Sequence, residues 1–266
     1  MRIARYSVEE TIRYGVVELA GDGGANPETV SDLTGDPFSG PVKLSGVRHG
    51  LADVRLLAPV LPRSKVIGIA KNSVPGQDVA PAPTTIPAVF LKPNTSVIGP
   101  GEAIQLPALS TDPALEAELA IVIGRICRSV TPERVPEVIF GYTVTNDVTA
   151  RDLMPAGVPW GVAKSWDTFT PLGPWIVTHL SVEEASSLAV TGLVDGECAT
   201  RGTTRGLIHG IAELVVFVSS IMTLLPGDVI LTGAPAGSAP IRAGQTVTIE
   251  VEEVGQLTNP VIGEAA

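Results

Sequence analysis

The sequence predicts a mainly β protein of the α+β class, with few helices. Most of its apolar runs are short, rich in β-branched residues and bounded by Gly or Pro, a pattern typical of buried strands. Hydrophobic residues make up 44% of the chain but aromatic residues only 4%, so we expect a large core built mostly from Val, Ile, Leu and Ala. Only two segments have the features of a helix.

The N-terminal part alternates in the manner of strands, in "RIARY" and "RYGVVEL", and is interrupted by a Gly-rich turn at residues 21–24. Two apolar runs separated by prolines follow, and we place a domain boundary near Leu61. This gives a small β-rich N-terminal domain over residues 1–60 and a second domain over residues 61–266. The Pro- and Ala-rich segment at residues 75–87 has no regular periodicity and is expected to be a loop.

Beyond that loop, one helix is expected to begin after Thr131 as N-cap, with Pro132 at its first position, and Pro136 should kink or shorten it. A longer helix is expected over about residues 204–225, ending at "PGD". The remaining apolar runs predict strands at "AVFLKP", "ELAIVIG", "IFGYTVTND", "GPWIVT", "LAVTGLVDG", "GDVILTG" and "QTVTIEVE".

Composition limits the partners. The formal net charge of −10 leaves no basic surface for phosphates, so we expect no nucleic-acid partner. The longest apolar run, residues 214–225, is too short to span a bilayer, and the N-terminal segment lacks the apolar core of a signal peptide. Cys127 and Cys198 lie far apart without metal-binding spacing, so we expect reduced thiols, a cytoplasmic location and no membrane association.

The stretch "ALEAELAIVIG" places Glu116 and Glu118 two residues apart where a buried strand is predicted. Side chains at i and i+2 leave a strand on the same face, so two carboxylates would lie together near a core, where like charges disfavour each other. A divalent cation would compensate, with Asp147 at the end of "YTVTND" as a third ligand; such an all-oxygen site suits Mg²⁺, Mn²⁺ or Ca²⁺. Alternatively, Asp147 caps a turn and the glutamates face solvent from an edge strand.

An ordered series of motifs resembles the fumarylacetoacetate hydrolase family over about residues 54–261, and the opening "MRIARY" resembles the N-terminal part of its bacterial members, such as 2-hydroxyhepta-2,4-diene-1,7-dioate isomerases and acylpyruvase-type enzymes. The resemblance implies a catalytic domain of the mixed β-sandwich roll type, a homodimer, and Mg²⁺ or Mn²⁺ held by Glu116, Glu118 and Asp147. The motifs are "KVIGIAKN", "FLKPNTSVIGPG", "EAELAIVIG", "GYTVTNDVTARD", "KSWDTFTPLGPWIVT", "LLPGDVILTGAP" and "GQLTNPV".

The resemblance also implies the chemistry. Family substrates are 2-oxo acids, β-dicarbonyl compounds or their enols, and the metal stabilises a developing enolate. Lys164 matches the family's lysine beside that charge. Arg151 is a candidate either for the distal carboxylate of the substrate or for a structural ion pair. Thr232 and Gly233 fall in a Thr-Gly turn that binds substrate oxygens.

The chain departs from the family pattern after Asn72. The family usually continues with Tyr, then a His and a Glu that activate water from a lid, whereas here the text is "SVPGQD", and no nearby residue replaces the histidine as a base. Met154 and Ala234 stand where the family often has Gln and Thr, so we expect a less polar substrate site.

These features predict a divalent-metal-dependent enzyme that acts through an enolate on a 2-oxo acid or β-dicarbonyl compound. Because the water-activating pair is missing, isomerisation (tautomerisation) or decarboxylation is favoured over hydrolysis. Two alternatives remain open: a C–C bond hydrolase of the acylpyruvate type, and a catalytically silent paralogue that binds a metabolite. The missing pair favours the silent paralogue, and the retained Lys164 disfavours it.

Overall fold

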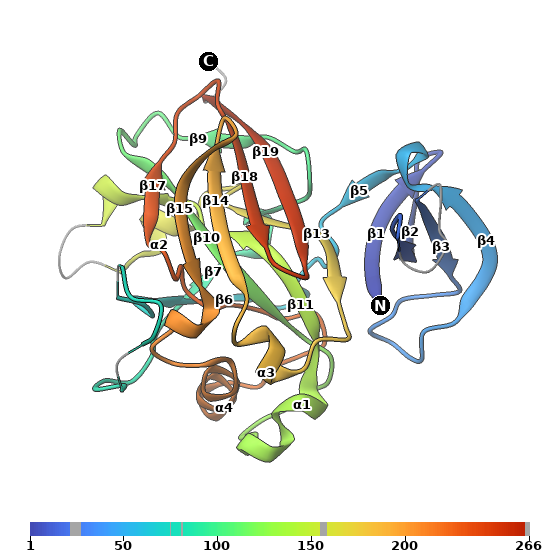
Figure 1. Cartoon of the computed structure of the whole chain (residues 1–266), viewed down its shortest axis with the longest axis horizontal. Coiled ribbons are helices and arrows are strands. Elements are labelled where there is room, and N and C mark those ends of the chain that lie inside the picture. Colours follow the sequence, from blue (N-terminus) through green and yellow to red (C-terminus); the bar gives the residue numbers. More distant parts are fainter. Residues whose placement is uncertain (22–27, 75, 81, 155–158, 264–266) are drawn as a thin grey trace.

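The computed structural model describes the whole chain except residues 22–27, 75, 81, 155–158 and 264–266. Its strands form a 14-stranded sheet and a 5-stranded sheet, accompanied by a few short helices (Figure 1). The predicted mainly β class is therefore confirmed.

The N-terminal lobe is an antiparallel meander that stands to one side of the molecule, in blue in Figure 1. It joins the rest of the large sheet where Arg2 and Ile3 pair with Val177 and Ile176. The division into domains at residue 60 stays a prediction. The strands of the lobe are β1 (Arg2–Val8), β2 (Thr11–Glu18), β3 (Thr29–Leu33) and β4 (Leu44–Gly50), followed by β5 (Arg55–Leu57), which pairs with β1.

The main body holds the other part of the large sheet and the whole smaller sheet, and every strand predicted after the loop is present. In the large sheet its strands are β6 (Val66–Ala70), β7 (Ala88–Lys92), β10 (Pro113–Ile123), β11 (Ile139–Asn146), β13 (Thr170–Val177) and β16 (Val229–Leu231), with β8 (Val97–Ile98), β12 (Thr149–Ala150) and β17 (Ser238–Pro240) paired beside them. The smaller sheet contains β9 (Ile104–Leu106), β14 (Ala189–Val194), β15 (Glu197–Thr203), β18 (Thr246–Val251) and β19 (Gly255–Gly263).

Strand β10 lies between two hydrophobic cores. Its odd-numbered residues from Leu115 to Ile123 belong to the larger core, and Ala120 and Val122 belong to the smaller one. Because side chains alternate along a strand, Glu116 and Glu118 continue the face of Ala120 and Val122. This strand therefore carries polar groups at one end of a face whose other end is fully apolar.

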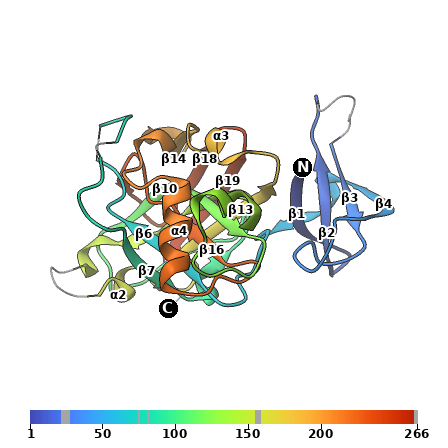
Figure 2. The same ribbon diagram turned by 90° about the horizontal axis from the view of Figure 1, so that it is seen from below.

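The helices are shorter than predicted. The helix expected over residues 204–225 is α4 (Ile211–Ile221), which lies on the outside of the main body in Figure 2. The preceding part is a 3₁₀ turn, η5 (Thr204–Gly206), and a segment held by Asn72, whose carbonyl accepts the N–H of Ile208 at 2.8 Å. At the other end, Leu224 leaves the helical path to pair with Cys127.

The helix expected after Thr131 is a 3₁₀ turn, η3 (Pro132–Arg134), continued by a single turn, α1 (Val135–Val138). Thr131 is the N-cap of η3 as predicted, and Pro136 lies in the first turn of α1, which ends two residues later at Val138. Two further short helices were not predicted, namely α2 (Gly161–Lys164) and α3 (Val182–Ala185). In the described part of the chain, no helix has the length and apolarity needed to cross a membrane.

Candidate metal centre and its pocket

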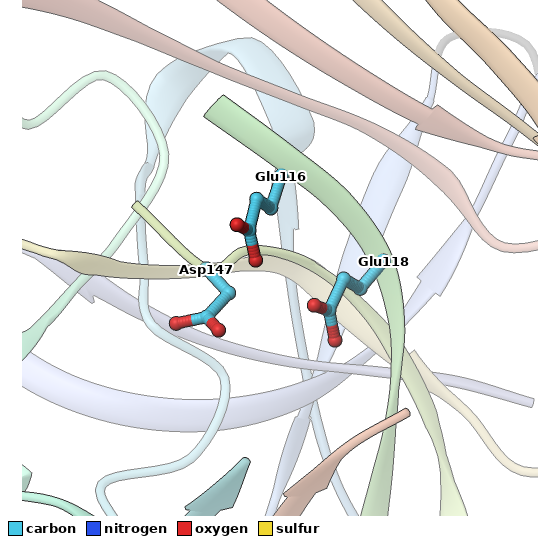
Figure 3. Close-up of side chains that lie close together, drawn as sticks. All are labelled: Glu116, Glu118 and Asp147. Atoms are coloured by element: carbon cyan, nitrogen blue, oxygen red, sulfur yellow. The ribbon is translucent and has the colours of Figure 1, made fainter. Parts of the chain in front are cut away.

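Three carboxylates converge beside the N-terminal half of β10, as Figure 3 shows. Glu116 and Glu118 leave the same face of β10, and Asp147 follows β11 directly; one oxygen of each lies within 4.8 Å of the others. Glu118 and Asp147 are 1% and 2% exposed, while the Glu116 side chain is 20% exposed. The structure thus brings together the three predicted ligands on a buried central strand, not on an edge strand.

Backbone pairing fixes the position of Glu116. Strand β10 pairs with β11 so that Ala117 lies opposite Asn146. The N–H of Glu116 donates to the side-chain oxygen of Asn146 at 3.0 Å, and the N–H of Asp147 donates to the carbonyl of Glu116 at 3.0 Å. These two bonds hold the Glu116 and Asp147 backbones together where the strands end.

Glu118 is held by the turn after β16. The N–H of Gly233 donates to the Glu118 carboxylate at 2.7 Å. Gly233 has a φ of 92°, and a Cβ at this position would lie 2.7 Å from the Cβ of Asn72. Only glycine combines that conformation with that close approach, so the turn requires the glycine of the "TG" motif.

Lys164, the last residue of α2, lies directly against the carboxylates. Its Nζ donates to Glu116 at 2.8 Å, to Asp147 at 2.5 Å and to the hydroxyl of Thr149 at 2.7 Å. The ammonium also lies 5.0 Å from the centre of the Phe90 ring, a cation–π distance. The side chain is only 4% exposed, so Lys164 is a buried lysine held by ionic partners.

Lys92, which the sequence reasoning missed, is a second buried cation at this site. It ends β7 with a fully buried side chain, and its Nζ donates to Asp147 and, at 2.7 Å, to the carbonyl of Phe169. Its one sequence signal is a lysine directly after the apolar run "AVFL" and before a proline. A buried lysine needs a partner, and Asp147 supplies it.

The two lysines compensate the three carboxylates to different extents. Burial alone would raise the pKa of Asp147, but Lys164 and Lys92 outweigh burial and lower it. Burial raises the pKa of Glu116, and raises that of Glu118 well above its usual range, where repulsion by Asp147 and Glu116 adds to the effect. The least compensated charge is therefore that of Glu118. Three oxygen ligands with a surplus of buried negative charge fit Mg²⁺ or Mn²⁺.

A cavity of about 190 Å³ opens beside this cluster. Glu116 and Lys164 line it together with apolar side chains, including Met154 and Trp160, in agreement with the expected low polarity. A larger hollow of about 450 Å³ lies beside Trp175, but it is remote from the carboxylate cluster. The smaller cavity is therefore the candidate active site.

Two predicted residues are already engaged with protein partners. The Arg151 guanidinium forms two hydrogen bonds with Asp112, at 3.0 and 2.6 Å, and a longer one to Ser238. The Thr232 hydroxyl is fully buried and donates to the carbonyl of Leu119 at 2.9 Å. Of the two roles weighed for Arg151, the structure contains the ion pair. The substrate contacts assigned to Thr232 and Gly233 stay predictions.

The loop that replaces the family's histidine lies near the pocket. Ser73 pairs with Leu207, and its hydroxyl donates to the carbonyl of Ala234 at 2.7 Å. None of the three histidines lines the cavity: His49 lies in the N-terminal lobe, His179 lies beside the N-terminus, and His209 bonds to an acid on α4. Residues 75 and 81 lie outside the described part, and the described residues between 74 and 87 form no helix or strand, as expected for a loop.

The fold and the site define a β-rich protein with a cluster of three carboxylates whose geometry could hold a divalent metal. The model for the C-terminal domain of fumarylacetoacetate hydrolase matches residues 65–262, and that for the Rv2993c-like N-terminal domain matches residues 1–59. The chain belongs to the fumarylacetoacetate hydrolase family. It is 43% identical to protein Rv2993c of Mycobacterium tuberculosis over 264 residues, which cover 98% of each chain.

Two solved structures illustrate the range of the family. One is 5-carboxymethyl-2-hydroxymuconate delta-isomerase from Mycobacterium smegmatis, with 45% identity and a TM-score of 0.90, covering 99% of this chain and 100% of that one. The other is maleylpyruvate hydrolase from Sphingobium sp. SYK-6 in complex with manganese and pyruvate, with 30% identity and a TM-score of 0.79, covering all of both chains. Similarity to isomerases and hydrolases supports an enzyme.

Proposed function

We propose that this chain is a divalent-metal-dependent enzyme that acts through an enolate on a 2-oxo acid or β-dicarbonyl compound. One observation carries the proposal: three carboxylates, two of them buried, have oxygens within 4.8 Å of one another, and one of the three, Glu116, lines a cavity together with the buried Lys164. Glu116, Glu118 and Asp147 would hold Mg²⁺ or Mn²⁺, and the ion would supply Lewis-acid stabilisation of an enolate oxygen. The manganese in the similar maleylpyruvate hydrolase supports this choice of ion.

Lys164 would stabilise the negative charge that develops on the substrate. Burial alone would lower its pKa, but Asp147 and Glu116 outweigh burial and raise it above the ordinary value, so the amine holds its proton. Because its three N–H groups are already donated to Glu116, Asp147 and Thr149, the ammonium would act on the substrate through its charge. Its three hydrogen bonds preorganise the ammonium, and the apolar lining strengthens its electrostatic effect.

Isomerisation or decarboxylation fits the pocket better than hydrolysis. Hydrolysis needs a group that activates water, and no histidine lines the cavity. The side chain of Asn72, where the family's lid motif begins, is already bonded to the backbone at residues 209 and 232. A C–C bond hydrolase remains the second candidate because of the similarity to maleylpyruvate hydrolase. A homodimer and a cytoplasmic location stay predictions.

The test is solvent deuterium exchange at C3 of a panel of 2-oxo acids, followed by NMR with Mg²⁺, with Mn²⁺ and with EDTA. We expect exchange that requires the metal and is lost in Glu118→Gln, while Glu197→Gln, at an exposed position on β15, leaves it unchanged. Release of pyruvate from acylpyruvates would identify the hydrolase. Metal binding without exchange on any acid of the panel would contradict the proposal and favour the silent paralogue.

A further inference from the structure

A second hollow, of about 270 Å³, lies just beyond the C-terminal end of β10, whereas the carboxylate cluster lies beside the N-terminal half of that strand. It borders η3 and α1, in green at the lower end of Figure 1. The charged side chains that line it are Arg125, Arg128, Arg134 and Glu137. Three cations and one anion give the hollow a formal charge of +2. The chain as a whole carries −10, so this hollow has the opposite sign.

Two of the three arginines have no anionic partner. No described carboxylate forms an ion pair with Arg125 or Arg128, and both side chains are open to solvent. Arg134 bonds to Glu137 at 3.1 Å through Nε, and no described group accepts a hydrogen bond from its two terminal nitrogens. Because like charges repel, cations gathered around one hollow oppose folding unless an anion neutralises them.

The loop that carries the two unpaired arginines is held in place by α4 and the segment after it. The backbones of Cys127 and Leu224 exchange two hydrogen bonds, at 3.0 and 2.9 Å. The N–H of Ser129 donates to the carbonyl of Ser219, on α4, at 2.9 Å. Ser129 has a φ of 50°, in the left-handed region that residues with side chains rarely adopt. The guanidinium groups therefore extend from a fixed backbone, and such conformations concentrate at functional sites.

We propose that this hollow binds a phosphate group, either as free phosphate or as the phosphoryl group of a small metabolite. The planar fork of a guanidinium matches two phosphate oxygens at once, and a phosphate dianion neutralises the charge of +2. The Cys127 thiol also lines the hollow; burial raises its pKa, so it stays protonated and leaves the positive charge intact. The inference goes beyond the proposed function and stands independently of it, because the two sites share no residue.

The experiment measures binding to the whole chain in the presence of Mg²⁺ by calorimetry, with inorganic phosphate, with glycerol 3-phosphate and, as a neutral control, with glycerol. Arg125→Gln and Arg128→Gln each remove one charge, and Arg128→Lys keeps the charge without the planar fork. Arg242→Gln, at an exposed position between β17 and β18, is the matched control. The rate at which Cys127 is alkylated in a Cys198→Ser background reports independently whether the ligand occupies this hollow.

We expect each Gln variant to weaken phosphate binding about tenfold, Arg128→Lys about threefold and Arg242→Gln less than about twofold. Ligand at about ten times its dissociation constant should slow the alkylation of Cys127 about tenfold, and glycerol should not slow it. Tighter binding of glycerol 3-phosphate than of phosphate would identify a phosphorylated metabolite as the ligand, and the reverse order would identify free phosphate.

Two results would overturn the inference. One is that the wild type binds neither compound at millimolar concentration. The other is binding that neither Gln variant weakens and that leaves Cys127 unprotected, which would place the anion elsewhere, for example at the metal centre. Neither result would affect the proposed function, because C3 exchange is measured without phosphate.

Discussion

Glu118→Gln changes the charge of the centre with little change of shape. The glutamine keeps an oxygen that can accept the Gly233 N–H, now 2.7 Å from the Glu118 carboxylate. It removes the negative charge that has the least compensation, since the lysines bond to Glu116 and Asp147. We therefore expect opposite effects on stability in the absence and in the presence of metal.

The size of the stability change expected for Glu118→Gln follows from the burial of this side chain. Glu118 is 1% exposed, and relieving a buried charge without an ionic partner is expected to raise the unfolding free energy of the metal-free protein by about 1–2 kcal/mol. Metal at 100 times its dissociation constant is expected to stabilise the wild type by about 2.7 kcal/mol. For a chain of this size, each kcal/mol corresponds to about 2–4 °C in the unfolding midpoint.

The raised pKa of Glu118 fixes the direction in which the stability of the metal-free protein changes with pH. The pKa of Glu118 is raised in the folded state, first by burial and then by Asp147 and Glu116, so the folded protein binds more protons than the unfolded chain above the ordinary carboxyl pKa. The stability of the metal-free wild type should therefore fall as the pH rises through that window. Glu118→Gln should flatten this part of the profile.

The assay is thermal unfolding followed by circular dichroism, with EDTA or with Mn²⁺, from pH 5 to pH 8. Glu197→Gln is the control for the loss of an exposed carboxylate. The reasoning is refuted if metal-free Glu118→Gln is less stable than the wild type and still gains the full stabilisation from Mn²⁺. That result would mean that Glu118 is neither unbalanced nor a ligand.

Three further predictions follow from the same contacts. Lys164→Met is expected to lower metal-dependent C3 exchange about 10²–10³-fold while Mn²⁺ still binds by calorimetry; unchanged exchange would contradict the assigned role. Gly233→Ala is expected to cost about 2–3 kcal/mol in chemical denaturation, since its Cβ would lie 2.7 Å from that of Asn72, and an unchanged midpoint would speak against it. Arg151→Ala should cost no more than about 1 kcal/mol because the pair with Asp112 is partly exposed, and a double-mutant cycle giving a larger coupling would be inconsistent.

The core of the site was predictable because it depends on local periodicity. Alternation along one strand placed Glu116 and Glu118 together, and the acid at the end of "YTVTND" supplied the third ligand. The family's motifs, which occur in order along the chain, led to Lys164. The longer apolar strands of the main body were predictable for the same reason, whereas the strands β8, β9, β12, β15, β17 and β19 were not predicted.

The supporting contacts were not predictable because they join distant segments. Lys92 reaches Asp147 across 55 residues, and Asn72 bonds to His209 across 137. The predicted start of α4 was wrong for the same reason: residues 207–210 look helical in sequence, but Asn72 and Ser73 hold their backbone in another conformation. The position of Lys92 after "AVFL" signals a buried lysine, but neither segment identifies its distant partner.

The route of the chain through the centre has a consequence for folding. Glu118 depends on Gly233, Asp147 on Lys92, and Glu116 on Lys164, so the site draws on strands that are far apart in sequence. A partly collapsed chain offers the ion at most isolated carboxylates, and we expect it to bind weakly. Capture of Mn²⁺ during refolding should therefore be a late event, and its time course would report when the main body has reached its native topology.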